Sequence, residues 1–334
     1  MFPLRSLSKC SNLRRIVAVV GMYSIIKYSQ FLIVVSHFKR CYVPRVKDHP
    51  SAIVHHLTHV PENERDEQLL SLRLAADIGA GTVDSPFVIF RDSHSKRRTD
   101  LKRLRFVCMS DTHNEIAKIT IPDGDVFVHC GDAVKHRTSA RDIRVFNEFV
   151  GRLPHKYKLF VSGNHCTCFD PKRPEETQQI LSNLIYLQDQ LIDIEGVRIY
   201  GSPWRPKRGC FYRAEAFGYD SKRIRSDKWS KIPEDIDLLL THGPPYSIRD
   251  YNESTGDALG CPALLDEIVT RVRPRVHLFG HMHSCFGASL YKSENNQILE
   301  GDRFNQPSDD ILFINLAVHQ GAMLNQPVII DYFY

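Results

Sequence analysis

The chain has 334 residues, of which 42% are hydrophobic and 25% charged, as is ordinary for a globular protein. Its formal charge of +5 is uneven: residues 1–50 hold nine Lys/Arg and one acidic residue, whereas residues 106–334 hold 26 Lys/Arg and 30 Asp/Glu. The basic excess therefore belongs to the N-terminal part, and no specific nucleic-acid binding is expected of the rest.

The N-terminal segment 16–35 is mostly apolar and has basic residues on both sides. Its length of about 20 residues suits a membrane span, but Lys27 at its middle would cost roughly 2.5 to 3.5 kcal/mol there. A cleaved secretory signal lacks a clear small-residue cleavage site after Val35, and a mitochondrial presequence would be less uniformly apolar. Membrane association and organelle targeting through residues 16–35 both stay open, so no localisation is assigned.

Residues 41–102 are polar and uneven, with one stretch of helical spacing, and are interpreted as a linker. We therefore expect an N-terminal extension over residues 1–102, made of the apolar segment and this linker, and one folded domain over residues 103–334. The nine cysteines are scattered, which indicates reduced thiols and a cytosolic-type setting for that domain rather than a disulfide framework.

Strands and helices alternate along the expected domain. Five apolar runs without alternation predict buried strands, over 104–109, 125–130, 158–162, 236–240 and 275–279. Helical spacing predicts a helix through Ile143 and Val150, a second from Pro174 toward Leu187, and a third from Pro262 to Val272. Near the C-terminus strands dominate, so an α/β fold with a second, more antiparallel sheet is expected.

Each of the five apolar runs is followed by a short motif rich in metal-ligand side chains. The motifs are Asp111-Thr112-His113, Gly131-Asp132, Gly163-Asn164-His165, Thr241-His242-Gly243 and Gly280-His281-Met282-His283. Residues two apart in an extended segment face the same side, so Asp111 and His113 can share one ion. Asp132 follows a glycine that permits a tight turn, and its two carboxylate oxygens suit a bridge between two ions.

The remaining candidate ligands add an amide oxygen from Asn164 and three imidazoles, from His242, His281 and His283. This mixed nitrogen and oxygen set without thiolate suits Mn²⁺, Fe or Zn²⁺ rather than Ca²⁺ or a soft ion. Two such ions can bind both nonbridging oxygens of a phosphate ester and hold a bridging hydroxide as the nucleophile. His165, next to Asn164, is placed to give the leaving oxygen a proton without ligating.

Other polar residues receive simpler interpretations. His129, His277 and His319 lie outside the five motifs, and His129 is expected to be a packed strand residue. Arg249 is a candidate for binding a substrate phosphate, because guanidinium matches phosphate geometry. A surface position would explain the same arginine.

The ordered series of motifs resembles the calcineurin-like metallophosphoesterase superfamily. Over about residues 103–334 the chain looks more narrowly like the metallophosphoesterase domain-containing (MPPED) group. The segments that carry this narrower resemblance are Phe106 to His113, Gly201-Ser202-Pro203-Trp204, Asp227-Lys228-Trp229 and Thr241-His242-Gly243-Pro244-Pro245. The resemblance implies a four-layer α-β-β-α sandwich of two mixed sheets, with the site at the strand ends.

The resemblance also implies an arrangement of ligands and an activity. Asp111, His113 and His283 would hold the first ion and Asn164, His242 and His281 the second, with Asp132 as the bridge. Relatives of this group are associated with Mn²⁺-supported hydrolysis of phosphodiesters, including cyclic nucleotides. An acidic residue commonly follows the G-N-H motif in the superfamily, but this chain has Cys166 there. Without that anion His165 is expected to be less basic.

Two functional hypotheses follow from these features. The first is a dinuclear-metal-dependent phosphodiesterase, with two Mn²⁺ ions and a small phosphodiester or nucleotide as substrate. The second is a regulator or scaffold of the same fold that binds nucleotides or a protein partner with little turnover. A protein phosphatase is a third candidate that the group's signatures do not favour, and the oligomeric state is not assigned.

Overall fold

The computed structural model describes residues 81–82, 86–91, 101–135, 140–207, 216–252, 256–300, 310–321 and 323–334. The apolar segment 16–35 and most of the expected linker lie outside the described residues, so their predictions stay open. Among the described residues, no helix combines the length and the apolar character that crossing a membrane requires.

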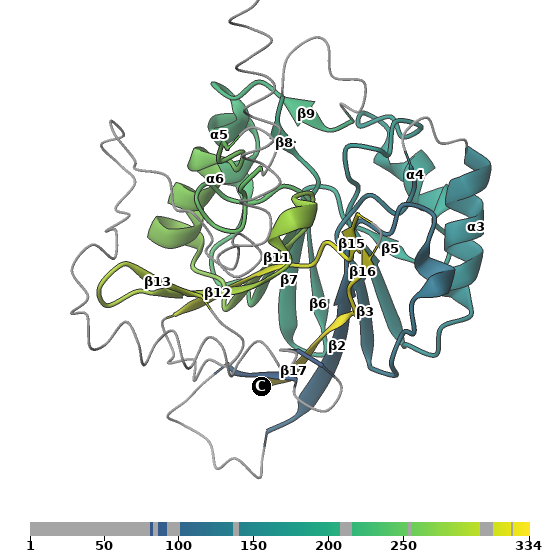
Figure 1. Ribbon diagram of the computed structural model, residues 1–334, viewed down its shortest axis with the longest axis horizontal. Helices are drawn as coiled ribbons and strands as arrows, with labels where there is room; N and C mark the ends of the chain where they lie inside the picture. The colour runs from purple at the N-terminus through teal and green to yellow at the C-terminus, as the bar shows by residue number, and fades with distance from the viewer. Residues whose placement is uncertain are drawn as a thin grey trace, which may run out of the picture. The chain divides into compact units, whose positions relative to one another are not determined.

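Two sheets form the centre of the described part (Figure 1). Sheet 1 has six strands in the order β1-β17-β2-β3-β4-β5. These strands are β1 (Phe87–Phe90), β17 (Val328–Phe333), β2 (Arg103–Met109), β3 (Val126–His129), β4 (Tyr157–Phe160) and β5 (Ile185–Tyr186).

Sheet 2 has seven strands in the order β13-β12-β14-β11-β10-β7-β6. They are β13 (Gln297–Glu300), β12 (Gly287–Lys292), β14 (Ile311–Asn315), β11 (Val276–Phe279), β10 (Leu238–Thr241), β7 (Val197–Ser202) and β6 (Gln190–Ile194). Sheet 1 has one antiparallel pairing, β17 with β2, whereas sheet 2 has three. The expectation of a second, more antiparallel sheet is confirmed.

Helices cover the outer faces of both sheets. In Figure 1, α3 (Ala140–Gly151) and α4 (Pro174–Ile180) lie beside sheet 1, and α5 (Ile224–Asp227) and α6 (Pro262–Glu267) lie beside sheet 2. A π-helical turn, η4 (Ile268–Val272), continues α6. The layers are therefore helix, sheet, sheet and helix, as the predicted α-β-β-α sandwich of two mixed sheets requires.

The core explains why the strands show no alternation of polar and apolar residues. Phe106 and Cys108 of β2 belong to a cluster of strand residues between the sheets, while Met109 packs with the helices outside. In β10, Leu238 faces the inner cluster and Leu239 the outer one. Because both faces of these strands are covered, most of their positions are apolar.

The predicted helices are present but differ in length. Ile143, Phe146 and Val150 form the buried face of α3, as their spacing predicts. The helix that begins at Pro174 was expected to run toward Leu187, and this expectation is wrong: it ends at Ile180. The chain then turns and forms β5, which pairs with β4 in parallel.

Strand β1 lies ahead of residue 103, where we expect the folded domain to begin. It pairs in parallel with β17, and Phe87 and Ile89 are buried in the cluster between the sheets. The residues that the sequence assigned to the linker thus include one strand of sheet 1. The boundary itself stays a prediction.

The described part of the chain also contains short turns and short strand pairs. They are the 3-10 turns η2 (Ile116–Lys118), η3 (Trp229–Lys231) and η5 (His283–Cys285), and the strand pairs β8 (Arg205–Pro206) with β9 (Gly218–Tyr219) and β15 (His319–Gln320) with β16 (Met323–Leu324). All six cysteines that lie in the described part of the chain are free thiols, as the sequence predicts for that part.

Candidate metal centre

All five motifs meet at one edge of the two sheets. They follow the carboxyl ends of β2, β3 and β4 in sheet 1 and of β10 and β11 in sheet 2. Backbone hydrogen bonds join neighbouring motifs: Asp111 N donates to Gly131 O (2.9 Å), and Gly280 N donates to His242 O (2.9 Å). The carboxyl ends of parallel strands form one edge, so residues up to 172 positions apart become neighbours.

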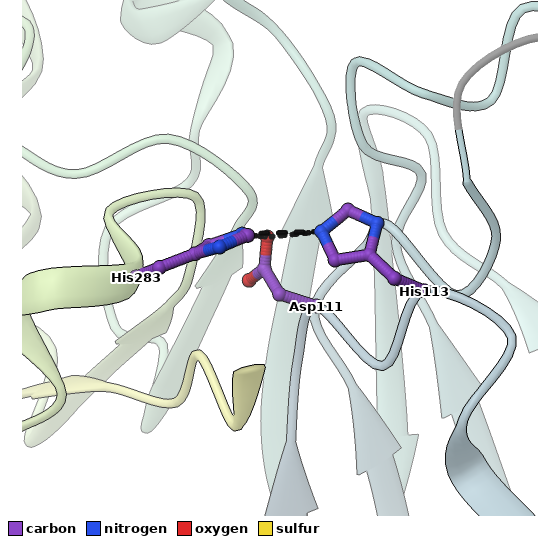
Figure 2. A group of neighbouring side chains, drawn as sticks. All are labelled: Asp111, His113 and His283. Atoms are coloured by element: carbon purple, nitrogen blue, oxygen red, sulfur yellow. Dashed lines mark hydrogen bonds and ion pairs between the residues drawn. The ribbon is translucent and has the colours of Figure 1, made fainter. Parts of the chain in front are cut away.

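The first group of side chains consists of Asp111, His113 and His283. Figure 2 shows the Asp111 carboxylate between the two imidazole rings. Its Oδ1 lies 3.3 Å from His283 Nε2 and 4.0 Å from His113 Nε2, and the two Nε2 atoms are 3.1 Å apart. The other ring nitrogen of His113, Nδ1, faces the carbonyl of Val134 at 3.3 Å. That contact directs Nε2 toward the other two ligand atoms.

The second group consists of Asp132, His242 and His281, with Asn164 beside it. His242 Nδ1 lies 2.9 Å from the carbonyl of Cys130, so its Nε2 faces Asp132 Oδ2 at 3.3 Å and Asn164 Oδ1 at 2.9 Å. The rings of His242 and His281 lie 5.0 Å apart. In each group of Asp and His residues, the potential ligand atoms lie within 4.8 Å of one another.

Each carboxylate is oriented by hydrogen bonds to one of its oxygens. Asp111 Oδ2 accepts from Ser110 Oγ (2.6 Å) and from His281 N (2.9 Å), which leaves Oδ1 toward the histidines. Asp132 Oδ1 accepts from His165 N (2.8 Å), which leaves Oδ2 toward His242. One oxygen of each carboxylate is therefore held in place and the other is presented to the group.

Imidazoles and carboxylates of the site shift one another's pKa values. Burial alone would raise the pKa of Asp111, but the hydrogen bond with His283 and the charges of His242 and His283 outweigh it and lower the pKa. Burial acts the same way on Asp132, and His242 and His165 lower its pKa. Although burial opposes protonation of the imidazoles, the pKa of His242 is raised by Asp132 and that of His283 by Asp111. Both carboxylates are thus anions that attract positive charge.

Backbone geometry at this edge is unusual. Asp111, His113, Asp132 and His281 all adopt positive φ, between 44° and 70°. Such conformations cost about 1 to 3 kcal/mol each in non-glycine residues and persist where surrounding structure enforces them, often at functional sites. The motif glycines leave the room that this requires. A Cβ on Gly280 would lie 2.2 Å from Asp111 Oδ2.

His165, the predicted acid, lies beside the carboxylate of Asp132. Its Nε2 is 3.8 Å from Asp132 Oδ2, and its ring packs edge-on against His113 with centroids 4.9 Å apart. Burial lowers the pKa of His165, against the opposing charge of Asp132. Cys166 is buried, and its Sγ accepts from Gly163 N at 3.4 Å. Burial is the cause of this lowered pKa, and the effect expected from Cys166 in place of an acidic residue stays a prediction.

Two buried histidines support the motifs from the outer faces of the sheets. His129 Nε2 lies 3.0 Å from Thr112 Oγ1, which donates to Ala133 O, and His277 Nε2 lies 2.8 Å from Thr241 Oγ1. Both histidines are fully buried, as expected of the packed residue His129. Each links a strand to the threonine beside a predicted ligand. The sequence predicted the burial of His129 but neither contact with a threonine.

Arg249 lies against the start of β12. Its Nε donates to Ser289 Oγ (2.9 Å), and its Nη2 and Nη1 donate to the carbonyls of Ala288 (2.5 Å) and Phe286 (3.3 Å). These bonds give the guanidinium a role in joining a loop to sheet 2. Its predicted role in binding a substrate phosphate stays a prediction.

The family model for calcineurin-like phosphoesterases matches residues 92–285. The chain belongs to the calcineurin-like phosphoesterase family. This membership, together with the Asp/His groups, fits a centre of two divalent metal ions and supports metal-dependent phosphoric ester hydrolysis as the class of chemistry.

Curated relatives share this region of the chain. Metallophosphoesterase domain-containing protein 1 of Homo sapiens is 38% identical over 207 residues, which cover 55% of this chain and 61% of that protein. A UPF0046 protein of Caenorhabditis elegans is 39% identical over 199 residues, which cover 55% of this chain and 65% of that protein. The chain thus spans less than two thirds of the length of these relatives.

Solved structures show a weaker likeness. TT1561 of Thermus thermophilus is 14% identical with a TM-score of 0.39, and the match covers 60% of this chain and 90% of that one. Haemophilus influenzae NAD nucleotidase is 14% identical with a TM-score of 0.35, over 65% of this chain and 46% of that one.

Proposed function

We propose that the protein is a dinuclear-metal-dependent phosphodiesterase that hydrolyses small phosphodiesters, with cyclic nucleotides as the leading candidates. The observation that carries this proposal is the convergence of Asp111 and Asp132, both buried, with imidazoles and an amide at one edge of two sheets. Among the described residues, no Lys or Arg forms an ion pair with either carboxylate, so a bound cation would supply the missing charge.

The donor set fits two ions. Asp111, His113 and His283 would hold one, Asn164, His242 and His281 would hold the other, and Asp132 would lie between them. The centre presents carboxylate and amide oxygens together with imidazole nitrogens, which suits Mn²⁺ while leaving Fe and Zn²⁺ as alternatives. Among the described residues, no cysteine belongs to these groups: Cys130 Sγ donates to the carbonyl of Leu278, and Cys166 Sγ accepts from Gly163 N.

When bound, the two ions would polarise the phosphate and make a water molecule acidic enough to serve as nucleophile near neutral pH. The chain's own residues perform the other tasks. His165 is held by its backbone N–H on Asp132 Oδ1, and its ring lies beside His113. From there we propose that it donates a proton to the oxygen of the leaving alcohol, a contribution typically of 10² to 10⁴ in rate.

We propose a diester rather than a monoester as the substrate. A phosphodiester carries one negative charge, whereas a monoester near neutral pH carries close to two and asks for more cationic side chains. Arg249, whose role in binding a substrate phosphate stays a prediction, has its guanidinium hydrogen-bonded at the start of β12. A monoanionic ester asks for less cationic charge, so small phosphodiesters of nucleosides are the natural class to assay first.

The test uses the full chain, stripped of metal with a chelator and assayed with and without added Mn²⁺. Bis(p-nitrophenyl) phosphate, p-nitrophenyl phosphate and a 2′,3′- and a 3′,5′-cyclic nucleotide serve as substrates. We expect Mn²⁺-dependent hydrolysis of the diesters, faster than that of the monoester. A rate of hydrolysis that does not depend on Mn²⁺, or a preference for the monoester, would refute the diesterase proposal.

The alternative is a regulator of the same fold that binds nucleotides or a protein partner with little turnover. It rests on Cys166, which stands where an acidic residue is common in the superfamily. The neighbouring His165 has a pKa that burial lowers. Cys166→Glu separates the two possibilities. A large rise in turnover with unchanged nucleotide affinity would favour the regulator, whereas a small change would favour the enzyme as it stands.

A further inference from the structure

One histidine outside the five motifs reaches the metal centre by an indirect route. After β14 the chain leaves sheet 2 and pairs with the end of β2 in sheet 1: Ser110 N donates to Leu316 O and Val318 N donates to Ser110 O, both at 3.0 Å. The next residue, His319, begins the hairpin of β15 and β16. This crossover brings His319 to the edge where Asp111 follows Ser110.

The ring of His319 lies against two imidazoles of the first group. Its centroid is 5.6 Å from that of His113, in an edge-on arrangement of 89°, and 5.6 Å from that of His283, at 49°. The ring is partly exposed, unlike the fully buried His129 and His277. Packing in the core therefore does not account for its place.

His319 stands beside the ligand atoms rather than among them. The groups of described residues whose ligand atoms lie within 4.8 Å of one another include His113, His165 and His283 but not His319. The ring of His113 thus packs against those of His165, which also lies beside Asp132, and of His319, which also lies beside His283. A phosphate group held at the first group of ligands would lie within reach of both.

We infer that His319 contacts the substrate, donating a hydrogen bond from a ring nitrogen to a nonbridging oxygen of the phosphate at the Asp111, His113 and His283 end of the centre. This inference rests on the proposed phosphoesterase function and assigns a residue that fixes the orientation of the ester. His165 serves the leaving oxygen, and His319 holds an oxygen that stays on phosphorus. No proton transfer is assigned to His319.

The variants His319→Ala and His319→Gln test this contact. Gln320→Ala is the matched control, because Gln320 is exposed on the same short strand. With bis(p-nitrophenyl) phosphate and Mn²⁺, we expect His319→Ala to raise KM about tenfold with a smaller change in kcat, since one hydrogen bond to a charged oxygen is lost. His319→Gln keeps a donor and should recover most of the loss.

Two readouts besides turnover make the inference independent of the assay. The dissociation constant of inorganic phosphate for the Mn²⁺-loaded protein, measured by calorimetry, should rise about tenfold in His319→Ala. The Mn²⁺ content should be the same in all variants. A fall in Mn²⁺ content would make His319 a metal ligand, and equal effects of Gln320→Ala would make it a bystander; either result overturns the inference.

The two proposals fail differently. If the wild-type protein hydrolyses no ester but binds phosphate in a way that depends on His319, the phosphodiesterase is refuted and the contact stands. If hydrolysis is Mn²⁺-dependent and His319→Ala leaves KM and phosphate affinity unchanged, the enzyme stands and the contact is refuted.

Discussion

Buried carboxylates at the two ends of the sheets have different partners. At the end opposite the motifs, Asp237 accepts hydrogen bonds from Arg91 Nε at 2.8 Å and from Tyr332 Oη at 2.6 Å. Asp331 accepts hydrogen bonds from two nitrogens of Arg105, each at 2.8 Å. At the motif end, the described partners of Asp111 and Asp132 are imidazoles, a hydroxyl and backbone N–H groups.

This difference separates structural charge from functional charge. A carboxylate with a bidentate arginine has its charge neutralised by the fold itself. Two carboxylates that share imidazoles are neutralised fully only when protons or metal ions arrive. The motif end is therefore where the fold leaves negative charge for a ligand, and the opposite end is where that charge holds the sheets together.

The largest expected effect comes from Asp132→Asn. Loss of the carboxylate that would lie between the ions should reduce Mn²⁺ content and lower kcat/KM by about 10³, on the order of 4 kcal/mol of transition-state stabilisation. Elemental analysis and diester hydrolysis measure both. Asp331→Asn, at the opposite end, should leave both intact; if it abolishes activity equally, the contrast between the two ends is wrong.

A second substitution tests whether the site depends on the exact position of the Asp111 carboxylate. In Gly280→Ala the new methyl group would meet Asp111 Oδ2 and Ser110 Oγ, each at 2.2 Å, so the motif must move. We expect loss of metal and a fall in activity of about 10²-fold, since positioning errors near 1 Å cost that much. Gly243→Ala is the control, because among the described residues its Cβ would meet the Cβ of Arg205 alone, at 3.2 Å. Similar losses in both variants would argue against this account.

The opposite end should respond in stability rather than in activity. Asp237→Asn removes the charge that Arg91 and Tyr332 share, and we expect it to lower the free energy of unfolding by about 2 to 3 kcal/mol. Denaturant unfolding of the metal-free protein measures the change. Asp132→Asn should cost less in the same assay, and the reverse order would contradict the distinction between structural and functional charge.

The smallest effect concerns pH. Burial lowers the pKa of His277 from 6.5 to about 3, so the unfolded chain binds a proton below about pH 6.5 while the folded chain does not. His277 therefore disfavours folding progressively as pH falls from about 6.5 toward 3. His277→Gln removes this titration and keeps a donor for Thr241.

Unfolding of the metal-stripped wild type and His277→Gln, at pH 7.5 and 5.5, tests this effect. On going from pH 7.5 to pH 5.5, the wild type should lose about 1.4 kcal/mol more free energy of unfolding than His277→Gln does. This amount corresponds to one pKa unit. Parallel pH profiles would show that His277 is protonated in the fold.

Residues joined by local rules could be predicted from sequence. The five metal-motif strands appear within a few residues of their expected positions, because each is an apolar run ended by glycine or polar residues. The ligand side chains converge because parallel strands end at one edge. A strand-end motif therefore predicts both the element and the place of Asp111 or His242.

Features that depend on distant contacts could not be predicted. Strand β1 is defined by its pairing with β17, whose partner residues lie more than 240 positions away. The place of His319 depends on where the chain crosses from sheet 2 to sheet 1. The guanidinium of Arg249 is hydrogen-bonded to β12, which lies about 40 residues later in the chain. The residues next to Arg249 in the sequence do not determine this contact. Local pattern carries no signal for these contacts.

The most direct test of the central claim is the stoichiometry of metal binding. Calorimetric titration of the metal-stripped full chain with Mn²⁺ should show two ions bound per chain. Diester hydrolysis, measured at each step of the titration, should appear as the sites fill. Binding of fewer than two ions at saturation, or hydrolysis that survives complete chelation, would contradict a dinuclear centre built from these seven ligands.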